Sequence, residues 1–267
     1  MKKQTIFLTG SVLLSTTLLT HAHEEPEVPV DNSWIGNIGI GVVATDGNTE
    51  NRSANANIDV TRDFDRWRHN LHIDSLYTAD EQRTTAEKYF ASWQSDYKLS
   101  ERDYVFAYAS YDDDRFSAFE WQATAVVGYG RILLATEDKN LNVEIGPGYR
   151  ASRTAEVFQL DDNDDKVRVP PAGNFNLLED NESLNEAILR LAEHFDWQFS
   201  PSSRFVQELN VEVGEDNTVT RGLLALESQI AGSLVVRLYY AIKHNTEVTD
   251  DTENSDTETG VTIAYNF

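Results

Sequence analysis

The sequence predicts an all-β protein, a single up-and-down antiparallel transmembrane β-barrel of about twelve strands with both termini on the periplasmic side. Three features predict this fold: an N-terminal secretory signal, repeated segments in which apolar and polar residues alternate, and an alternating final segment that ends in Phe267. Alternation with a period of two indicates strands whose two faces meet different environments.

The first 22 residues are typical of a cleaved secretory signal. Lys2 and Lys3 precede an apolar stretch over 6–19, which is too short for a membrane-spanning helix of about 20 residues. Thr20 and Ala22 then place small residues on either side of His21, as at a cleavage site. The expected layout is a signal peptide over residues 1–22, a short periplasmic segment over 23–33 and an outer-membrane barrel over 34–267.

The acidic composition excludes nucleic acid as a partner. Without Lys2 and Lys3, 20 of the 22 basic residues remain, against 45 acidic residues, and such a chain is repelled by phosphate backbones. The mean hydropathy of −0.47 does not distinguish a soluble protein from a barrel, because a transmembrane barrel alternates apolar with polar residues. The chain has no cysteine, and no motif in it predicts a cofactor.

Residues 119–131 show the alternation most clearly. The odd positions are Phe119, Trp121, Ala123, Ala125, Val127 and Tyr129, and the even positions are Glu120, Gln122, Thr124, Val126, Gly128 and Gly130. From 119 to 129 a strand rises roughly 33 Å and, at a tilt of about 40°, covers roughly 25 Å of height, the apolar band of such barrels. Aromatic residues at both ends of the apolar face match the two interfaces of a bilayer.

The same alternation recurs along the chain. It predicts strands near residues 34–45, 50–62, 66–79, 86–99, 103–111, 119–133, 140–151, 184–199, 204–213, 219–231, 233–246 and 256–267. The polar face is too charged for the core of a soluble barrel, so the apolar face is expected to point outward. The aromatic girdle on that face is expected to contain Trp67, Tyr77, Tyr89, Trp93, Phe119, Trp121, Tyr129, Tyr149 and Trp197.

The connections between these segments alternate in length. Residues 63–65 and 100–102 form short turns, whereas 152–183 is expected to be a long acidic extracellular loop. Short periplasmic turns and longer outer loops are typical of outer-membrane barrels. An even number of strands returns the C-terminus to the side of the N-terminus, which places both in the periplasm.

One strand departs from the alternation. In 184–199, Glu193 falls on the outward face between Leu191 and Phe195. An ionisable side chain is costly within the hydrocarbon layer. Either a β-bulge resets the register there, or Glu193 lies at a membrane interface.

The last segment, 261–267, alternates and ends in an aromatic residue. Ile263, Tyr265 and Phe267 resemble the C-terminal recognition signal of the outer-membrane barrel assembly machinery. That machinery is therefore an expected partner, together with outer-membrane lipids and lipopolysaccharide.

Several short motifs resemble a known family. They are Trp34-Ile35-Gly36, Asp46-Gly47-Asn48-Thr49, Asp96-Tyr97-Lys98-Leu99-Ser100, Arg102-Asp103-Tyr104-Val105-Phe106, Val127-Gly128-Tyr129-Gly130, Gly146-Pro147-Gly148-Tyr149-Arg150 and Phe195-Asp196-Trp197. On these residues the chain resembles, from Trp34 to Phe267, the YdiY-like family of salt-induced outer-membrane proteins, a domain of unknown function. The resemblance implies a barrel linked to salt or envelope stress, without an established activity. The loop 152–183 is longer and more acidic than the family pattern.

The polar face is expected to line the lumen and carries charges of both signs. The lumen-facing candidates are Arg68, His72, Asp74, Glu144, Arg150, Arg190, Arg237 and Lys243. Charges in a narrow barrel must pair or stay hydrated. The lumen is therefore either a weakly cation-preferring pore for small ions or a salt-bridged plug that does not conduct. We expect a structural or narrow-channel role in the envelope under salt or osmotic stress.

No nucleophile motif is present, and we expect no enzymatic activity. The alternative is a surface enzyme that modifies lipid or lipopolysaccharide, for which His244 and Ser255 are the candidate residues. A soluble lipocalin-like barrel, with its apolar residues inward, is the alternative fold. We expect no dedicated metal site, although carboxylate oxygens in the long loop could collect divalent cations. Those acidic residues are Asp161, Asp162, Asp164 and Asp165.

Overall fold

The computed structural model describes residues 34–46, 51–80, 83–114, 119–154, 158–160, 166–168, 183–248 and 253–267. The expected signal peptide (1–22), the segment 23–33 and the four aspartates of the long loop lie outside this part of the chain. The strands are β1 (Trp34–Asp46), β2 (Asn51–Asp63), β3 (Trp67–Asp80), β4 (Arg83–Lys98), β5 (Asp103–Asp114), β6 (Phe119–Ala135), β7 (Lys139–Thr154), β8 (Phe158–Leu160), β9 (Lys166–Arg168), β10 (Ser183–Ser200), β11 (Ser203–Val213), β12 (Thr218–Ala231), β13 (Leu234–Asn245) and β14 (Ser255–Asn266).

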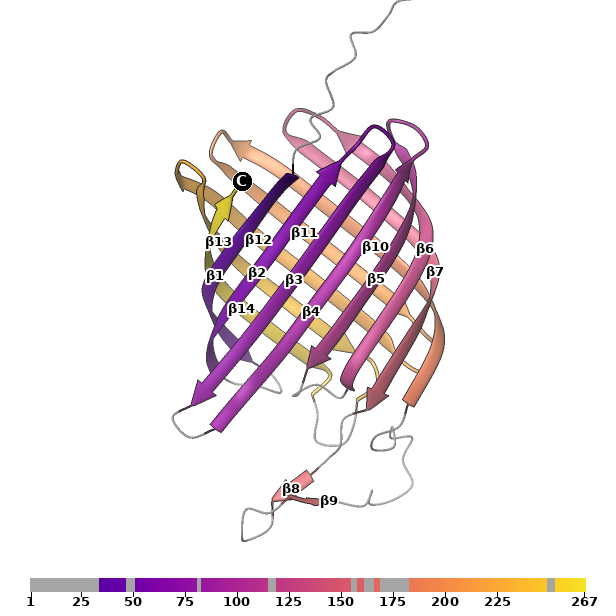
Figure 1. Ribbon diagram of the computed structural model, residues 1–267, viewed down its shortest axis with the longest axis vertical. Helices are drawn as coiled ribbons and strands as arrows, with labels where there is room; N and C mark the ends of the chain where they lie inside the picture. The colour runs from indigo at the N-terminus through magenta and orange to yellow at the C-terminus, as the bar shows by residue number, and fades with distance from the viewer. Residues whose placement is uncertain are drawn as a thin grey trace, which may run out of the picture. The chain divides into compact units, whose positions relative to one another are not determined.

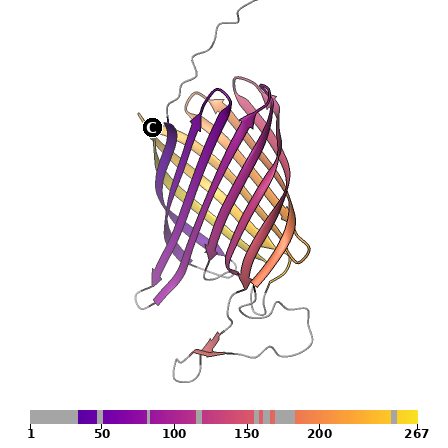
Figure 2. The ribbon, with the colours of Figure 1, turned by 45° about the vertical axis from the view of Figure 1, so that its right-hand side comes forward.

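Twelve of these strands form one closed antiparallel barrel, in the order β1-β14-β13-β12-β11-β10-β7-β6-β5-β4-β3-β2 (Figures 1 and 2). Apart from the step from β7 to β10, each strand pairs with its neighbours in sequence, and β1 pairs with β14. The ring closes with two backbone hydrogen bonds between Gly36 and Phe267, at N···O distances of 3.0 and 3.1 Å. The predicted twelve-strand barrel is confirmed, and β8 and β9 form a separate two-stranded pair.

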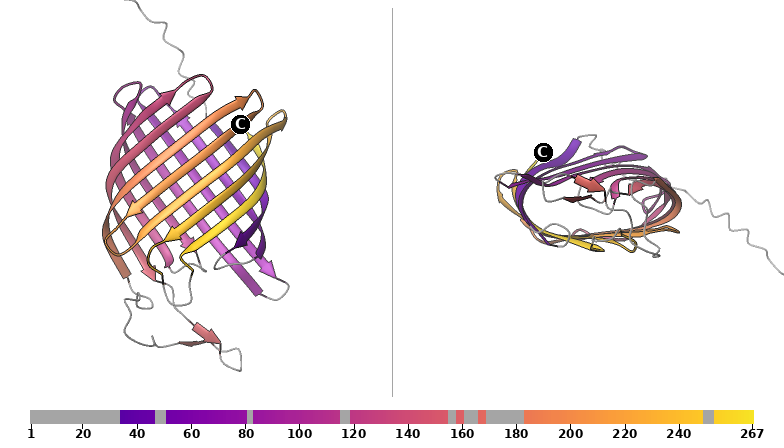
Figure 3. Two further views of the ribbon diagram at one scale, coloured as in Figure 1. Left: turned by 180° about the vertical axis from the view of Figure 1, so that it is seen from behind. Right: turned by 90° about the horizontal axis from the view of Figure 1, so that it is seen from below.

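The two ends of the barrel differ in their connections. The end where β1 starts and β14 finishes has short links over 64–66, 136–138 and 232–233, and Gly232 in the last of these has a positive φ of 53°. We call this the turn end, and the opposite end, which carries the connection 155–182, the loop end (Figure 3). The first strand of the barrel therefore starts at the turn end, and the last strand finishes there.

The apolar residues of the strands point outward. Val127 is 63% exposed and Ile263 52% exposed, and Leu71 is exposed as well. Side chains on the other face are bonded across the interior between strands that are not neighbours, for example Asp112 on β5 and Lys243 on β13. The lipocalin-like alternative is therefore wrong, since it required the apolar residues inside. Among the described residues, no helix is long and apolar enough to cross a membrane.

The aromatic girdle follows the prediction with one exception. The exposed members on the outward face are Trp67, Tyr77, Tyr89, Trp93, Tyr129, Tyr149 and Trp197, and Trp121 is half-buried there. Phe119 is only 2% exposed, and the prediction that it belongs to the girdle is wrong. The β6–β7 register shifts between Phe119 and Trp121. This bulge turns Phe119 to the inner face beside Thr154 and leaves Glu120 exposed.

The strand ends extend some of the predicted ranges. β5 continues to Asp114 rather than stopping at 111, and β7 continues to Thr154. The connection predicted over 152–183 is therefore shorter at its start, and it contains the small β8–β9 pair. At Glu193 the pairing of β10 with β7 and β11 is unbroken, so the bulge considered there is absent and Glu193 remains outward.

The outward face predicts a specific pattern of tolerance to charge. Leu71→Arg places a cation against the hydrocarbon layer and is expected to lower the free energy of unfolding in a bilayer by about 2–4 kcal/mol. Asn70→Arg is one residue away, on the inner face where Asn70 alternates with Arg68 and His72 and accepts a hydrogen bond from Thr61, and is expected to cost less than about 1 kcal/mol. Urea unfolding of the two variants in lipid vesicles checks this. An equal or larger loss for Asn70→Arg would contradict the assignment of the two faces.

Candidate channel lumen

The inner face of the barrel encloses a cavity of about 750 Å³. Seven of the eight predicted lumen residues line it: Arg68, His72, Asp74, Glu144, Arg190, Arg237 and Lys243. The eighth, Arg150, is also on the inner face but is buried in an ion-pair layer beside the cavity. All eight predicted residues therefore lie on the inner face of the barrel.

Six charged residues, five of them buried and Arg221 partly buried, join across the barrel near the loop end. We call them the loop-end layer, and they are Asp112, Arg150, Glu186, Glu212, Arg221 and Lys243. Arg150 Nε donates to Glu186 at 3.0 Å, and its Nη1 lies 3.4 Å from Glu212. Arg221 reaches Glu212 at 3.6 Å and Asp112 at 2.9 Å. Lys243 Nζ donates to the same oxygen of Asp112 at 2.7 Å.

This layer connects opposite walls of the barrel. Asp112 lies on β5, whereas its two cationic partners lie on β12 and β13, which are not neighbours of β5 in the sheet. Arg150 and Glu212 are each only 1% exposed. Buried ions of this kind are stable only when paired, so the layer both holds the walls together and narrows the lumen at this level.

A second polar cluster lies nearer the turn end. Glu144 accepts hydrogen bonds from Gln94 at 2.7 Å, Tyr104 at 2.9 Å and Arg190 at 2.7 Å. Gln94 also donates to Asp96, which is paired with Arg68. These residues come from β3, β4, β5, β7 and β10, so the cluster spans about half of the barrel wall.

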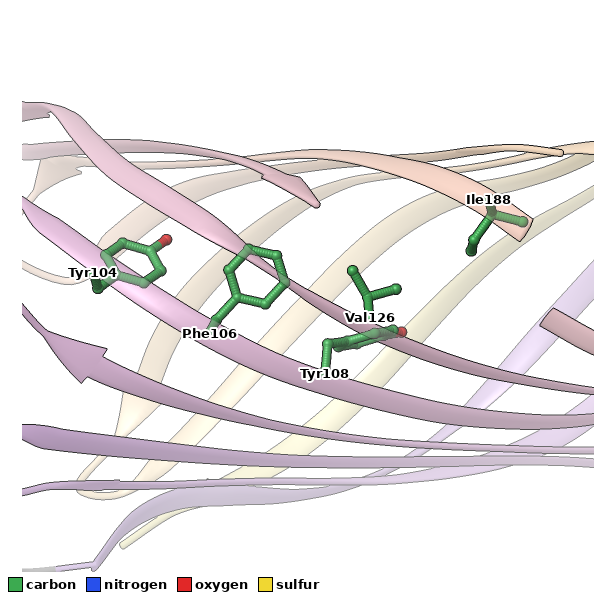
Figure 4. Packing of buried hydrophobic residues seen from close by; sticks show 5 residues of the cluster. All are labelled: Tyr104, Phe106, Tyr108, Val126 and Ile188. Atoms are coloured by element: carbon green, nitrogen blue, oxygen red, sulfur yellow. The ribbon is translucent and has the colours of Figure 1, made fainter. Parts of the chain in front are cut away.

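The sequence did not reveal an aromatic stripe on the inner face of β5. Tyr104, Phe106 and Tyr108 point inward and pack with Val126 and Ile188 (Figure 4). The guanidinium of Arg190 lies over Tyr108, 4.2 Å from the ring centroid. The ring of Phe106 lies on Gly128, where an added Cβ would be 2.6 Å from a ring carbon. The glycine therefore makes room for the aromatic ring.

The middle of the cavity carries two histidines on different walls. Both ring nitrogens of His72 on β3 are bonded to carboxylates, Nδ1 to Asp59 and Nε2 to Asp74. His194 on β10 lies 3.4 Å from Glu208 on β11. Within the described ranges, no group of three or more His, Asp or Glu side chains is arranged to hold a metal ion. Their contacts with Asp59, Asp74 and Glu208 make the two imidazoles partners of the lumen carboxylates.

With histidine counted as neutral, the inward side chains that line the cavity have a surplus of negative charge. Eight are carboxylates: Asp59, Asp74, Asp112, Asp114, Glu144, Glu208, Asp256 and Glu258. Six are arginines or lysines: Arg68, Lys88, Arg190, Arg221, Arg237 and Lys243. A surplus of carboxylates raises the local concentration of cations.

A histidine and a serine are hydrogen-bonded on the outer surface of the barrel. Nδ1 of His244 lies 2.7 Å from the hydroxyl oxygen of Ser255. The two residues are opposite each other on β13 and β14, at the loop end and on the outward face. The structure thus brings together the pair that the sequence suggested only by proximity along the chain.

The chain has relatives in sequence and in fold. "Uncharacterized protein YdiY" of Escherichia coli (strain K12) is 24% identical over 233 residues, which are 87% of this chain and 82% of that protein. The solved NanC porin is 12% identical with a TM-score of 0.51, and the match covers 86% of this chain and 100% of the porin. The family described as "Protein of unknown function, DUF481" matches residues 38–267. The chain therefore belongs to this family, which includes the YdiY-like proteins that its motifs resemble.

Proposed function

We propose that the protein is a narrow, weakly cation-preferring channel of the outer membrane, exported by a cleaved signal peptide, with its turn end and both termini in the periplasm. The observation that carries this proposal is the charged cavity of about 750 Å³ inside a closed barrel. A barrel that served only as a structural element could fill its interior with apolar side chains. The surplus of lumen carboxylates favours small cations over anions.

The loop-end layer makes the channel narrow. Its paired side chains cross the lumen, so ions must pass beside them in water rather than through an open bore. If no such path exists, the same layer makes the protein a plugged structural barrel. The resemblance to salt-induced proteins supports a role during salt or osmotic stress, when a small pore would add little leakage.

A second candidate function is the modification of lipid or lipopolysaccharide at the outer surface. The bond between Ser255 and His244 favours it, because an imidazole next to a hydroxyl can act as the base for a nucleophile. A third group that orients the imidazole is normally part of such a site. Among the described residues, no carboxylate is hydrogen-bonded to His244. We therefore place the channel first and expect no enzymatic activity.

The channel proposal predicts a small conductance. Refolded protein in planar bilayers is expected to give discrete current steps, with a reversal potential in a KCl gradient that shows preference for K⁺. Replacing carboxylates of the cavity wall, as in Asp74→Asn with Glu258→Gln, is expected to reduce this preference because the wall loses negative charge. Bilayers that stay silent after insertion of folded barrels would instead support the plugged structural barrel.

The loop-end layer predicts that replacing Arg150 changes the stability and the conductance of the barrel more than replacing Arg153 does. Arg150→Ala removes the guanidinium partner of Glu186 and leaves Glu212 paired with Arg221 alone. It is expected to cost about 3–5 kcal/mol of stability and to increase the unit conductance. Arg153→Ala is the matched control, because Arg153 is partly exposed on the outward face of the same strand, 4.0 Å from Glu120. Equal effects of both substitutions on unfolding and conductance would contradict the proposed layer.

The enzymatic alternative has a direct test. Purified protein is incubated with phospholipid and lipopolysaccharide, and the masses of the lipids are measured. We expect no change of mass, with wild-type protein or with His244→Ala. A mass change that His244→Ala and Ser255→Ala both abolish would replace the channel by the enzyme as the leading function.

A further inference from the structure

The outward face of β10 and β11 carries a polar pair. Glu193 alternates along β10 with the exposed Leu191 and is opposite the exposed Leu209 on β11, which places it on the outward face. The amide Nε2 of Gln207, on the same face, donates to Oε2 of Glu193 at 3.2 Å. The pairing of β10 with β7 and β11 is regular at this point, so no bulge explains the outward carboxyl group. The pair is therefore a built feature of this face.

Glu193 lies deep in the hydrocarbon layer. Trp197, the girdle residue at the turn end of β10, is four residues away along the strand, which is about 10 Å of height for a tilted strand. In the other direction, the girdle residue Tyr149 pairs with Ala187, six residues away. The carboxyl group thus lies near the middle of the apolar band. The position at a membrane interface that the sequence analysis considered for Glu193 does not fit these distances.

The residues around the pair are apolar. Glu193 is opposite Val143 on one side and Leu209 on the other, and Leu191 precedes it on the same face. The rings of Phe195 and Phe205 lie beside it, with centroids 6.4 Å apart. Nothing in this neighbourhood supplies further hydrogen bonds, and within the described residues the bond to Gln207 is the one that Glu193 makes.

A carboxyl group and an amide at this depth have unused hydrogen-bonding capacity. Lipid tails offer no donors or acceptors, so polar groups in the layer are driven to find protein partners. Such groups in a membrane are functional by default. The pair is also self-complementary, because it presents an acceptor and a donor side by side.

We propose that the β10–β11 face is the interface of a homodimer, with its two-fold axis along the membrane normal. Glu193 of each copy would accept from Gln207 of the partner subunit, so that the same patch meets itself, as in an isologous interface. A second copy fits better than another partner because it inserts in the same orientation and brings its own pair to the same height. The flanking leucine and phenylalanine side chains would pack around the four polar groups. This proposal is independent of whether the lumen conducts.

The absence of cysteine in the chain allows a clean test. Leu209→Cys places one thiol beside Glu193, and Ile73→Cys places one on the outward face of β3, far from β10 and β11 in the sheet. Under mild oxidation in native membranes, Leu209→Cys is expected to form disulfide-linked dimers and Ile73→Cys is not. Light scattering of the uncross-linked protein in nanodiscs is expected to give the mass of two chains.

The polar pair itself is tested by substitution. Glu193→Leu combined with Gln207→Leu is expected to lower the dimer association constant by about tenfold or more, while Glu193→Gln, which keeps the hydrogen bonds, is expected to retain the dimer. Heat-modifiable migration in gels confirms that each variant folds. The proposal is overturned if Leu209→Cys cross-links no more than Ile73→Cys, if the leucine variant stays dimeric, or if the wild type is a monomer, including one with lipid bound at this face.

Discussion

Backbone hydrogen bonding in a solvent without water is the constraint on which the rest of the structure depends. In hydrocarbon every unpaired N–H and C=O group is costly, so a sheet can cross a membrane only if it has no free edge. Pairing of β1 with β14 over Asn37 to Asp46, with the bonds between Gly36 and Phe267 beyond it, removes the last edge. Once the ring is closed, every strand must present one face to lipid and the other to the lumen.

The charged interior follows from this closure. The apolar side chains are needed outside, so the inner face receives the polar half of each strand, and the narrow ring brings charges from opposite walls together. Their pairing takes the place of a hydrophobic core. Space inside the ring also limits the aromatic stripe of β5. Tyr104 and Phe106 fit inside because β6 has glycine at the positions that their rings contact. Stability and restricted passage therefore come from the same side chains.

The fold could be predicted from the sequence because apolar and polar residues alternate along each strand, and this alternation reflects the different environments of its two faces. The facing of Arg68, Arg150 and Lys243 followed from that period alone. Phe119 was assigned to the wrong face because a bulge shifts the register by one residue, and a bulge leaves little local trace. Which charges pair could not be predicted, since Asp112 and Lys243 are 131 residues apart and meet only after closure. The inward aromatic residues were missed because β5 carries apolar residues on both faces.

The departures from a regular pattern differ in kind. At Phe119 the sequence keeps its alternation, but a β-bulge shifts the register and moves the aromatic ring to the inner face. At Glu193 the strands stay in register, and the conflict remains on the lipid-facing surface with only Gln207 to reduce it. The barrel forms a β-bulge at Phe119, but none turns the carboxyl group of Glu193 inward. A polar side chain kept on the lipid-facing surface in this way is expected where that surface has a further role. The two proposals thus rest on the two faces of one wall: the channel on the charged inner face, and the dimer on Glu193 and Gln207 of the outer face.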